Sequence, residues 1–227
     1  MGFSHISLTE GDLATKEGKI GNNPLCFTQF PVMGMATSYS ANRYITCSSA
    51  AGTALATGSK TDNGMLGVTP DSAELTSIAY KIHNAGFPVG ITTSVTIDHA
   101  TPASFYANSS ARSDYYSIAE QLATSGFEFF GGGGFYGAKD KREQEKSLYE
   151  IASEAGYEFA YGVDEFAGKK DSAEKMVLFQ KGEKKNNDLP YVAERVEGDL
   201  TLPQVVESAI EFLNNEKGFF LMAEGGK

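Results

Sequence analysis

Short runs of β-branched and aromatic residues alternate with amphipathic helical patterns along most of the chain. The runs that predict strands are residues 43–46, 88–95, 127–130, 157–160, 176–180 and 219–223. Helical patterns lie between them, at residues 49–57, 73–85, 114–125, 141–155 and 202–215. Strands separated by helices of about 10–15 residues are typical of βαβ units, whose mainly parallel sheet is covered on both faces. The pattern therefore predicts an α/β fold, a three-layer sandwich.

Length and composition agree with one compact unit. The 227 residues, 41% of them apolar, can bury a sizeable core, and we expect a single domain over residues 1–227. The polar stretch 181–195 is interpreted as a surface excursion rather than a domain boundary. The 25 glycines sit at the ends of the periodic segments, so they indicate turns and not low complexity.

Charge and cysteine content exclude some classes of function. A net charge of −10 argues against a broad nucleic-acid or membrane-surface footprint. We expect no membrane span, because no window of about 18 apolar residues exists, and residues 1–20 lack the pattern of a signal peptide. The sequence leaves open whether Cys26 and Cys47 form a disulfide.

The stretch 44–60 (YITCSSAAGTALATGSK) is the most distinctive of the chain. A strand that leads into Ser48 and then into a helix of small residues places a hydroxyl at a helix N-terminus, which favours an anion such as phosphate. The alternative is that Ser48 is only an N-cap. Residues 52–61 differ from the phosphate-binding P-loop in their spacing, and the G-x-S-x-G turn of α/β-hydrolases is absent.

Two further segments contain candidate residues for a ligand or metal site. Residues 132–137 fit G-x-G-x-x-G, but the charged residues that follow disfavour a dinucleotide site. Residues 97–112 (IDHATPASFYANSSAR) follow a predicted strand. Asp98, His99 and Thr101 can ligate a metal there, and Arg112 offers a planar fork for phosphate. The alternative is a capped loop that leads into a helix with an exposed arginine.

Together these segments resemble the alkaline phosphatase family. Its motif Asp-Ser-Ala-Ala-x-Ala/Gly-Thr-Ala aligns with residues 46–54 (TCSSAAGTA), and its Ala-Thr-Pro motif with the downstream arginine aligns with residues 100–112. A strand that closes in Glu-Gly matches residues 219–225, and the family's Gly-Gly-Gly after a strand matches residues 131–134.

The resemblance implies a role for each aligned residue. Ser48 is expected to be the nucleophile and a zinc ligand, and Arg112 to clamp the phosphate. Thr101 and Glu224 are expected to bind magnesium, with His99 at the third metal site. The implied reaction is hydrolysis of small phosphate monoesters through a phosphoserine intermediate, with Zn and Mg as cofactors. The resemblance also implies a homodimer and a periplasmic or extracellular location.

The sequence departs from the family pattern beside these residues. Cys47 stands where the family has an aspartate that helps to position the arginine, so we expect Arg112 to be less ordered or to find another acceptor. Ser49 replaces an alanine, and Asn108 lies where members often carry histidine.

The ends of the sequence also differ from the family. Members begin with a strand that leads into Gly-Asp-Gly, and they continue past Glu-Gly-Gly-Lys to an aspartate and histidines that hold two zinc ions. The sequence begins at Met1 and ends at Lys227, which predicts an internal piece without a zinc pair and without activity of its own. Two alternatives remain: another hydrolase of the superfamily, such as a sulfatase or phosphodiesterase, or a non-catalytic phosphate-binding remnant.

Overall fold

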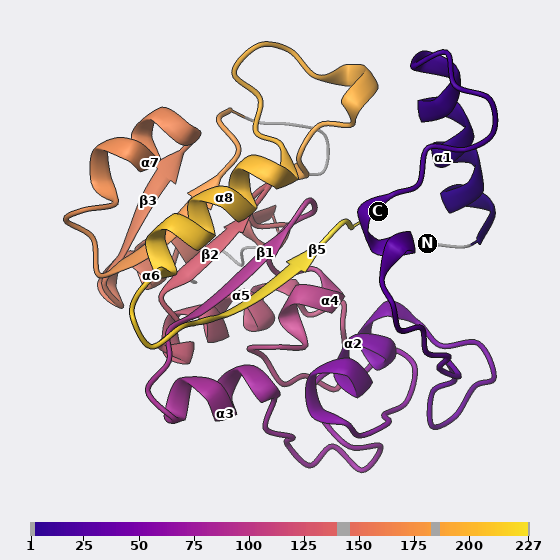
Figure 1. Cartoon of the computed structure of the whole chain (residues 1–227). Coiled ribbons are helices and arrows are strands. Elements are labelled where there is room, and N and C mark those ends of the chain that lie inside the picture. The colour runs from indigo at the N-terminus through magenta and orange to yellow at the C-terminus, as the bar shows by residue number, and fades with distance from the viewer. Residues whose placement is uncertain (1–2, 140–145, 183–186, 227) are drawn as a thin grey trace. The chain divides into compact units, whose positions relative to one another are not determined.

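The computed structural model describes residues 3–139, 146–182 and 187–226, and Figure 1 shows its elements. Contacts divide the chain into two compact units, Met1–Thr37 and Ser38–Lys227. The expectation of one domain over residues 1–227 stays a prediction. Within the described ranges, none of the helices combines the length and apolar character needed to cross a bilayer.

The first unit contains helix α1 (Phe3–Lys16) and a 3₁₀ turn, η1 (Cys26–Gln29). The sequence analysis did not predict α1. The buried carboxylate of Glu10 fastens α1 to the chain that follows, since it accepts hydrogen bonds from the Asn22 amide, the Leu25 N–H and the Thr28 hydroxyl at 3.0, 3.0 and 2.6 Å. These three bonds lower the pKa of Glu10, with the bond from Thr28 contributing most.

The second unit is built on a five-stranded sheet in the order β3-β4-β2-β1-β5. All neighbouring strands run parallel. The strands are β1 (Val89–Thr93), β2 (Phe129–Gly132), β3 (Tyr157–Tyr161), β4 (Lys175–Phe179) and β5 (Phe220–Glu224). Each corresponds to a predicted strand, so the α/β prediction is confirmed.

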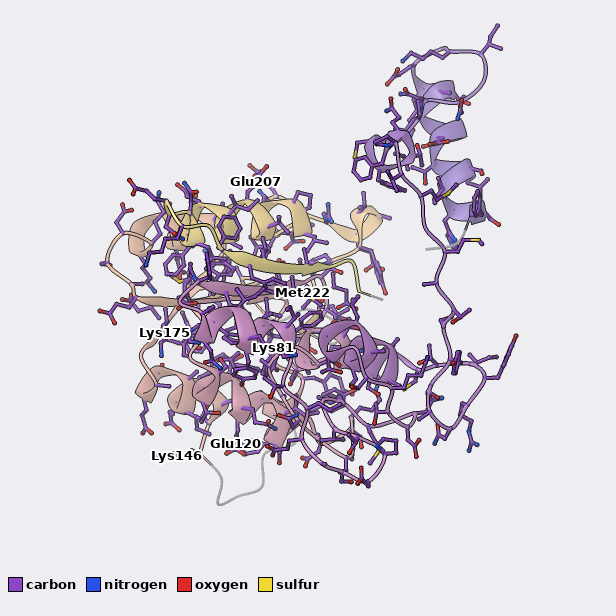
Figure 2. The ribbon with its side chains drawn as sticks, turned by 60° about the horizontal axis from the view of Figure 1, so that its bottom comes forward. Lys81, Glu120, Lys146, Lys175, Glu207 and Met222 are labelled. Atoms are coloured by element: carbon purple, nitrogen blue, oxygen red, sulfur yellow. The ribbon has the colours of Figure 1, made fainter. Side chains whose placement is uncertain are left out.

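Helices cover both faces of this sheet. One core joins α7 (Val163–Lys169) and α8 (Leu202–Leu213) to one face. The other core joins the opposite face to α3 (Ile78–Asn84), α5 (Tyr115–Ser125) and α6 (Leu148–Glu154). Figure 2 shows this layering, with Met222 of β5 between Glu207 on α8 and Glu120 on α5. The predicted three-layer arrangement is therefore observed.

Glycine in the strands lets α8 approach the sheet closely. A Cβ atom on Gly131 would lie 2.5 Å from Cγ1 of Val205, so a larger residue would push α8 outward. Two of the predicted helices begin later in the structure, because Ser77 caps α3 and Ser147 caps α6 with their side chains. Residues 141–145 of the predicted helix 141–155 lie outside the described residues.

The stretch predicted as a surface excursion, 181–195, is exposed only in part. Residues 183–186 lie outside the described residues. Leu189 is buried, and its N–H donates to the Ser94 carbonyl at 2.9 Å, just beyond the end of β1. Tyr191 and Val192 are exposed. The excursion thus folds back over the carboxyl end of the sheet.

Candidate active site

Helix α2 (Ser48–Thr57) begins at Ser48 and ends at Gly58, which takes a left-handed conformation. Ser48 is exposed, whereas Ser49 is fully buried. The small residues of α2 allow a close approach to α4 (Ala100–Ala103). A Cβ atom on Gly52 would lie 2.7 Å from Ser104 Oγ and 3.3 Å from Thr101 Cα. The sequence of α2 therefore brings the Ser48 helix against the Thr101 segment.

The strand predicted at residues 43–46 is wrong. These residues form bends and irregular backbone, and Tyr44 and Ile45 are 92% and 81% exposed. The backbone here pairs with a side chain instead of a strand: Asn63 donates to the Ile45 carbonyl and accepts from the Cys47 N–H, both at 3.0 Å. Sequence analysis passed over Asn63, although the dipeptide Asn-Gly is a strong turn signal.

Asp98 is a structural anchor. Its side chain is fully buried, and its two oxygens accept the N–H groups of Tyr136 and Gly137 at 3.0 and 2.7 Å. Burial raises the pKa of Asp98 to about 6, and the backbone donors oppose that shift. Both oxygens are thus occupied by the backbone, which leaves Asp98 poorly placed as the metal ligand considered from sequence.

The same contacts account for the glycine-rich match at 132–137. The loop leads into a 3₁₀ turn, η2 (Gly137–Lys139), rather than into an α-helix. A dinucleotide site needs free N–H groups at a helix start, whereas here Asp98 occupies those of Tyr136 and Gly137. The structure therefore disfavours the dinucleotide interpretation.

Three of the predicted site residues share one electrostatic environment. Burial lowers the pKa of His99, the positive charge of Arg112 lowers it further, and the negative charge of Glu224 raises it. His99 precedes α4, Arg112 follows it in the chain, and Glu224 ends β5. The Glu224 carboxylate accepts from the Thr93 hydroxyl at 2.7 Å, which fixes it at the carboxyl end of β1.

Arg112 is anchored through its backbone. Its N–H donates to the Gly64 carbonyl at 2.7 Å, and the Gly64 N–H donates to Cys47 Sγ at 3.2 Å. The half-buried guanidinium group makes no hydrogen bond or ion pair within the described part of the chain. The distance between the Ser48 hydroxyl and this guanidinium stays a prediction.

Cys47 carries an acidic thiol. Burial raises its pKa, but the bond with the Ser49 hydroxyl and the nearby backbone N–H groups outweigh burial and bring the pKa to about 7. Cys47 Sγ lies 3.1 Å from Ser49 Oγ. Cys26 and Cys47 are both free thiols in the structure.

Asn108 has a structural role at the position where the family often has histidine. Its amide donates to the carbonyls of Gly67 and Leu75. Its backbone exchanges two hydrogen bonds with the side chain of Gln121, at 2.9 and 3.0 Å. These contacts fix the loop that leads towards Arg112.

The donor atoms at this edge suit a hard cation better than a zinc pair. Thr101 and Glu224 offer oxygen ligands of the kind that magnesium prefers, and the buried Nδ1 of His99 has no hydrogen-bond partner among the described residues. Zinc sites use three or four N, O or S ligands. Within the ranges that the structure describes, no group of three or more His, Cys, Asp or Glu side chains could hold a metal ion.

Comparison with known proteins identifies relatives of the chain. It is 32% identical to alkaline phosphatase 4 of Bacillus subtilis over 81% of its length, and 27% identical to the alkaline phosphatase of Gadus morhua over 97%. These matches span only 39% and 55% of the two relatives.

Solved structures that resemble this chain are also alkaline phosphatases. The alkaline phosphatase of the Antarctic bacterium TAB5 superposes with a TM-score of 0.78 at 27% identity, covering 93% of this chain and 60% of that one. The alkaline phosphatase of Thermus thermophilus superposes with a TM-score of 0.81 at 29% identity, and the match covers 98% of this chain and 47% of that one. A TAB5 variant with glutamate in place of a histidine carries Mg in its M3 site. Because the family model for alkaline phosphatase matches residues 1–227 in full, the chain belongs to the alkaline phosphatase family.

Proposed function

We propose that this chain supplies the nucleophile and the phosphate clamp of a phosphate-monoester hydrolase. The observation that carries the proposal is the exposed Ser48 at the start of α2, in a segment hydrogen bonded through Gly64 to the backbone of Arg112. A hydroxyl at a helix N-terminus and an arginine fork are the groups that a phosphate needs.

Ser48 would attack phosphorus and break the ester bond, so that the alcohol leaves with the serine proton and a phosphoserine remains. Water would then hydrolyse the phosphoserine, which releases phosphate and restores the Ser48 hydroxyl. The N-terminal N–H groups of α2 would face the developing negative charge. Arg112 would pair with two nonbridging oxygens, for which its unpaired guanidinium is available. Selectivity for the alcohol should be low, because these contacts are all made to the phosphate.

Metal ions have a defined place in this proposal. Thr101 and Glu224 would hold magnesium and Ser48 would contact zinc. His99, whose pKa is lowered chiefly by burial but raised by the charge of Glu224, and whose Nδ1 has no hydrogen-bond partner among the described residues, would serve the third metal site. When bound, the metals supply a lowered pKa for the attacking hydroxyl and for water, together with positive charge against the phosphate. Thr93 orients Glu224 through its hydroxyl, and Gly52 permits the close approach of α2 to the Thr101 backbone.

We also infer from family membership that the protein acts as a homodimer in the periplasm or outside the cell. Sedimentation of the purified protein and fractionation of its native host test these two points. A monomer, or protein confined to the cytoplasm, would contradict them.

The experiment that tests the proposed chemistry compares the two neighbouring serines. In the chain extended by the N-terminal Gly-Asp-Gly strand and the C-terminal zinc-binding region of the family, we expect Ser48→Ala to lower turnover of p-nitrophenyl phosphate, in the presence of Zn and Mg, by several orders of magnitude. Ser49→Ala should keep most of it, because Ser49 is fully buried. The same comparison made by vanadate binding is independent of turnover. Equal losses, or the reverse order, would show that Ser48 is not the nucleophile.

A further inference from the structure

A short segment lies between the chain before Ser48 and the chain before Arg112. We call residues 63–67 the spacer segment. It contains a glycine, Gly64, with a φ of +94°, a conformation that other residues adopt only with strain. The spacer segment makes hydrogen bonds to both neighbours, and no residue in it belongs to the proposed catalytic set.

On one side, the spacer segment fixes the backbone before Ser48. The Asn63 side chain accepts the Cys47 N–H and donates to the Ile45 carbonyl, each at 3.0 Å. An asparagine amide offers one acceptor and donors in a single plane, so it replaces the edge of a neighbouring strand. The Asn63 N–H is held in turn by Asn42 Oδ1 at 3.0 Å.

On the other side, the spacer segment pairs with the chain that leads to Arg112. Leu66 and Ser109 exchange both backbone hydrogen bonds at 2.9 Å, and the Gly64 carbonyl accepts the Arg112 N–H at 2.7 Å. Gly64 also donates its N–H to Cys47 Sγ at 3.2 Å. Gly64 is thus bonded both to Cys47, which precedes Ser48, and to the backbone of Arg112.

This arrangement matters because the arginine side chain is not held directly. The Arg112 guanidinium makes no hydrogen bond within the part of the chain that the structure describes. The placement of Arg112 relative to Ser48 then depends on the backbone path through Gly64. A misplacement of about 1 Å can cost on the order of a hundredfold in rate.

We propose that Asn63 and Gly64 are positioning residues, which set the spacing between the Ser48 hydroxyl and the Arg112 guanidinium for a tetrahedral oxyanion. The inference rests on the proposed function, because the spacing has a purpose only if these two groups bind one phosphate.

The test compares Asn63→Ala with a matched control, Asn215→Ala. Asn215 also bridges backbone groups, since it donates to the Leu213 and Gly218 carbonyls at 2.8 and 3.0 Å and accepts the Lys217 N–H at 2.8 Å. It lies in the turn between α8 and β5, at the amino end of the sheet. Each variant loses a bridging asparagine, but only Asn63 is bonded to the residue that precedes Ser48.

The probe is vanadate, a phosphate analogue, with binding measured by calorimetry on the full chain. We expect Asn63→Ala to weaken vanadate binding by about tenfold or more, and Asn215→Ala to change it by less than twofold. In an Arg112→Ala background, Asn63→Ala should cost little further affinity, because two groups that act as a unit are not additive. Equal losses in Asn63→Ala and Asn215→Ala, or fully additive losses with Arg112→Ala, would overturn the proposal.

The failure of the proposed function has a different signature. The proposed function is contradicted if the unaltered chain does not bind vanadate, or if Arg112→Ala leaves vanadate binding unchanged. Amide hydrogen exchange then decides the positioning role by itself. Exchange at the Cys47 and Arg112 N–H groups should rise together in Asn63→Ala and stay unchanged in Asn215→Ala; a rise at Cys47 alone would overturn the link between the two segments.

Discussion

Asp98 shows how one buried side chain can join two loops. Its carboxylate joins the loop that carries His99 to the glycine-rich loop after β2, through the N–H groups of Tyr136 and Gly137. A carboxylate accepts both bonds, whereas an asparagine offers one oxygen and one donor group. Aspartate therefore suits this position better than asparagine, because two backbone N–H groups point at its carboxylate.

We predict that Asp98→Asn destabilises the protein by about 1–3 kcal/mol, because one buried N–H group loses its acceptor. Urea unfolding measures this change. The control is Asp164→Asn in the first turn of α7, an exposed position, for which we expect a change within about 0.5 kcal/mol. An effect of Asp98→Asn no larger than the control would mean that the two backbone bonds contribute little.

The motifs and the resemblance predicted five candidate site residues with a role for each, and these roles stay predictions, whereas the structural roles of Asp98 and Asn63 were not predicted. Ser48, His99, Thr101, Arg112 and Glu224 were found by their motifs. The roles of Asp98 and Asn63 depend on backbone groups 39 or 16 positions away in the chain. Such pairings arise only when the loops fold together, so no local pattern of residues indicates them.

At the level of elements, the contact between α2 and α4 positions the proposed nucleophile. Gly52 in α2 faces Ser104 and the backbone of Thr101. A glycine inside a helix costs about 1 kcal/mol relative to alanine, so its presence here reflects the space available and not helix propensity.

We predict that Gly52→Ala destabilises the protein by about 1–3 kcal/mol through overpacking, since its Cβ would lie 3.3 Å from Thr101 Cα and closer still to Ser104 Oγ. The matched control is Gly11→Ala in α1, where a Cβ meets nothing within 4 Å, and alanine should be neutral or favourable. Thermal unfolding of both variants measures the difference. A Gly52→Ala variant as stable as Gly11→Ala would indicate that α2 and α4 can move apart freely.

The strands and helices that the sequence predicted correctly are those with a clear pattern of apolar residues. All five strands of the sheet were predicted, because each is a short run rich in β-branched or aromatic residues. The segment 43–46 has the composition of a strand, but no neighbouring strand hydrogen bonds to it in the described chain, and Asn63 takes that place. Helices α1, α4 and α7 were not predicted. Helix α4 has only 4 residues, too few for a helical period.

For the whole molecule, the sheet order explains why distant segments meet. Strand β1 lies between β2 and β5, so loops that follow strands more than a hundred residues apart in sequence emerge at one carboxyl edge (Figure 1). Such an edge is where ligands bind in open α/β sheets. Thr93 and Glu224 are directly paired there, in register between β1 and β5. The sequence predicted a shared crevice, whereas the strand order itself depends on long-range pairing that local patterns do not encode.

The central claim is that Ser48 and Arg112 hold one phosphate at this edge. A crystal structure of the chain with bound vanadate measures it directly. We predict vanadate between the Ser48 hydroxyl and the Arg112 guanidinium, with these two groups about 4–8 Å apart, as hydrogen bonds of about 2.8 Å on each side require. Vanadate bound elsewhere, or an Arg112 side chain directed away from Ser48, would contradict the account.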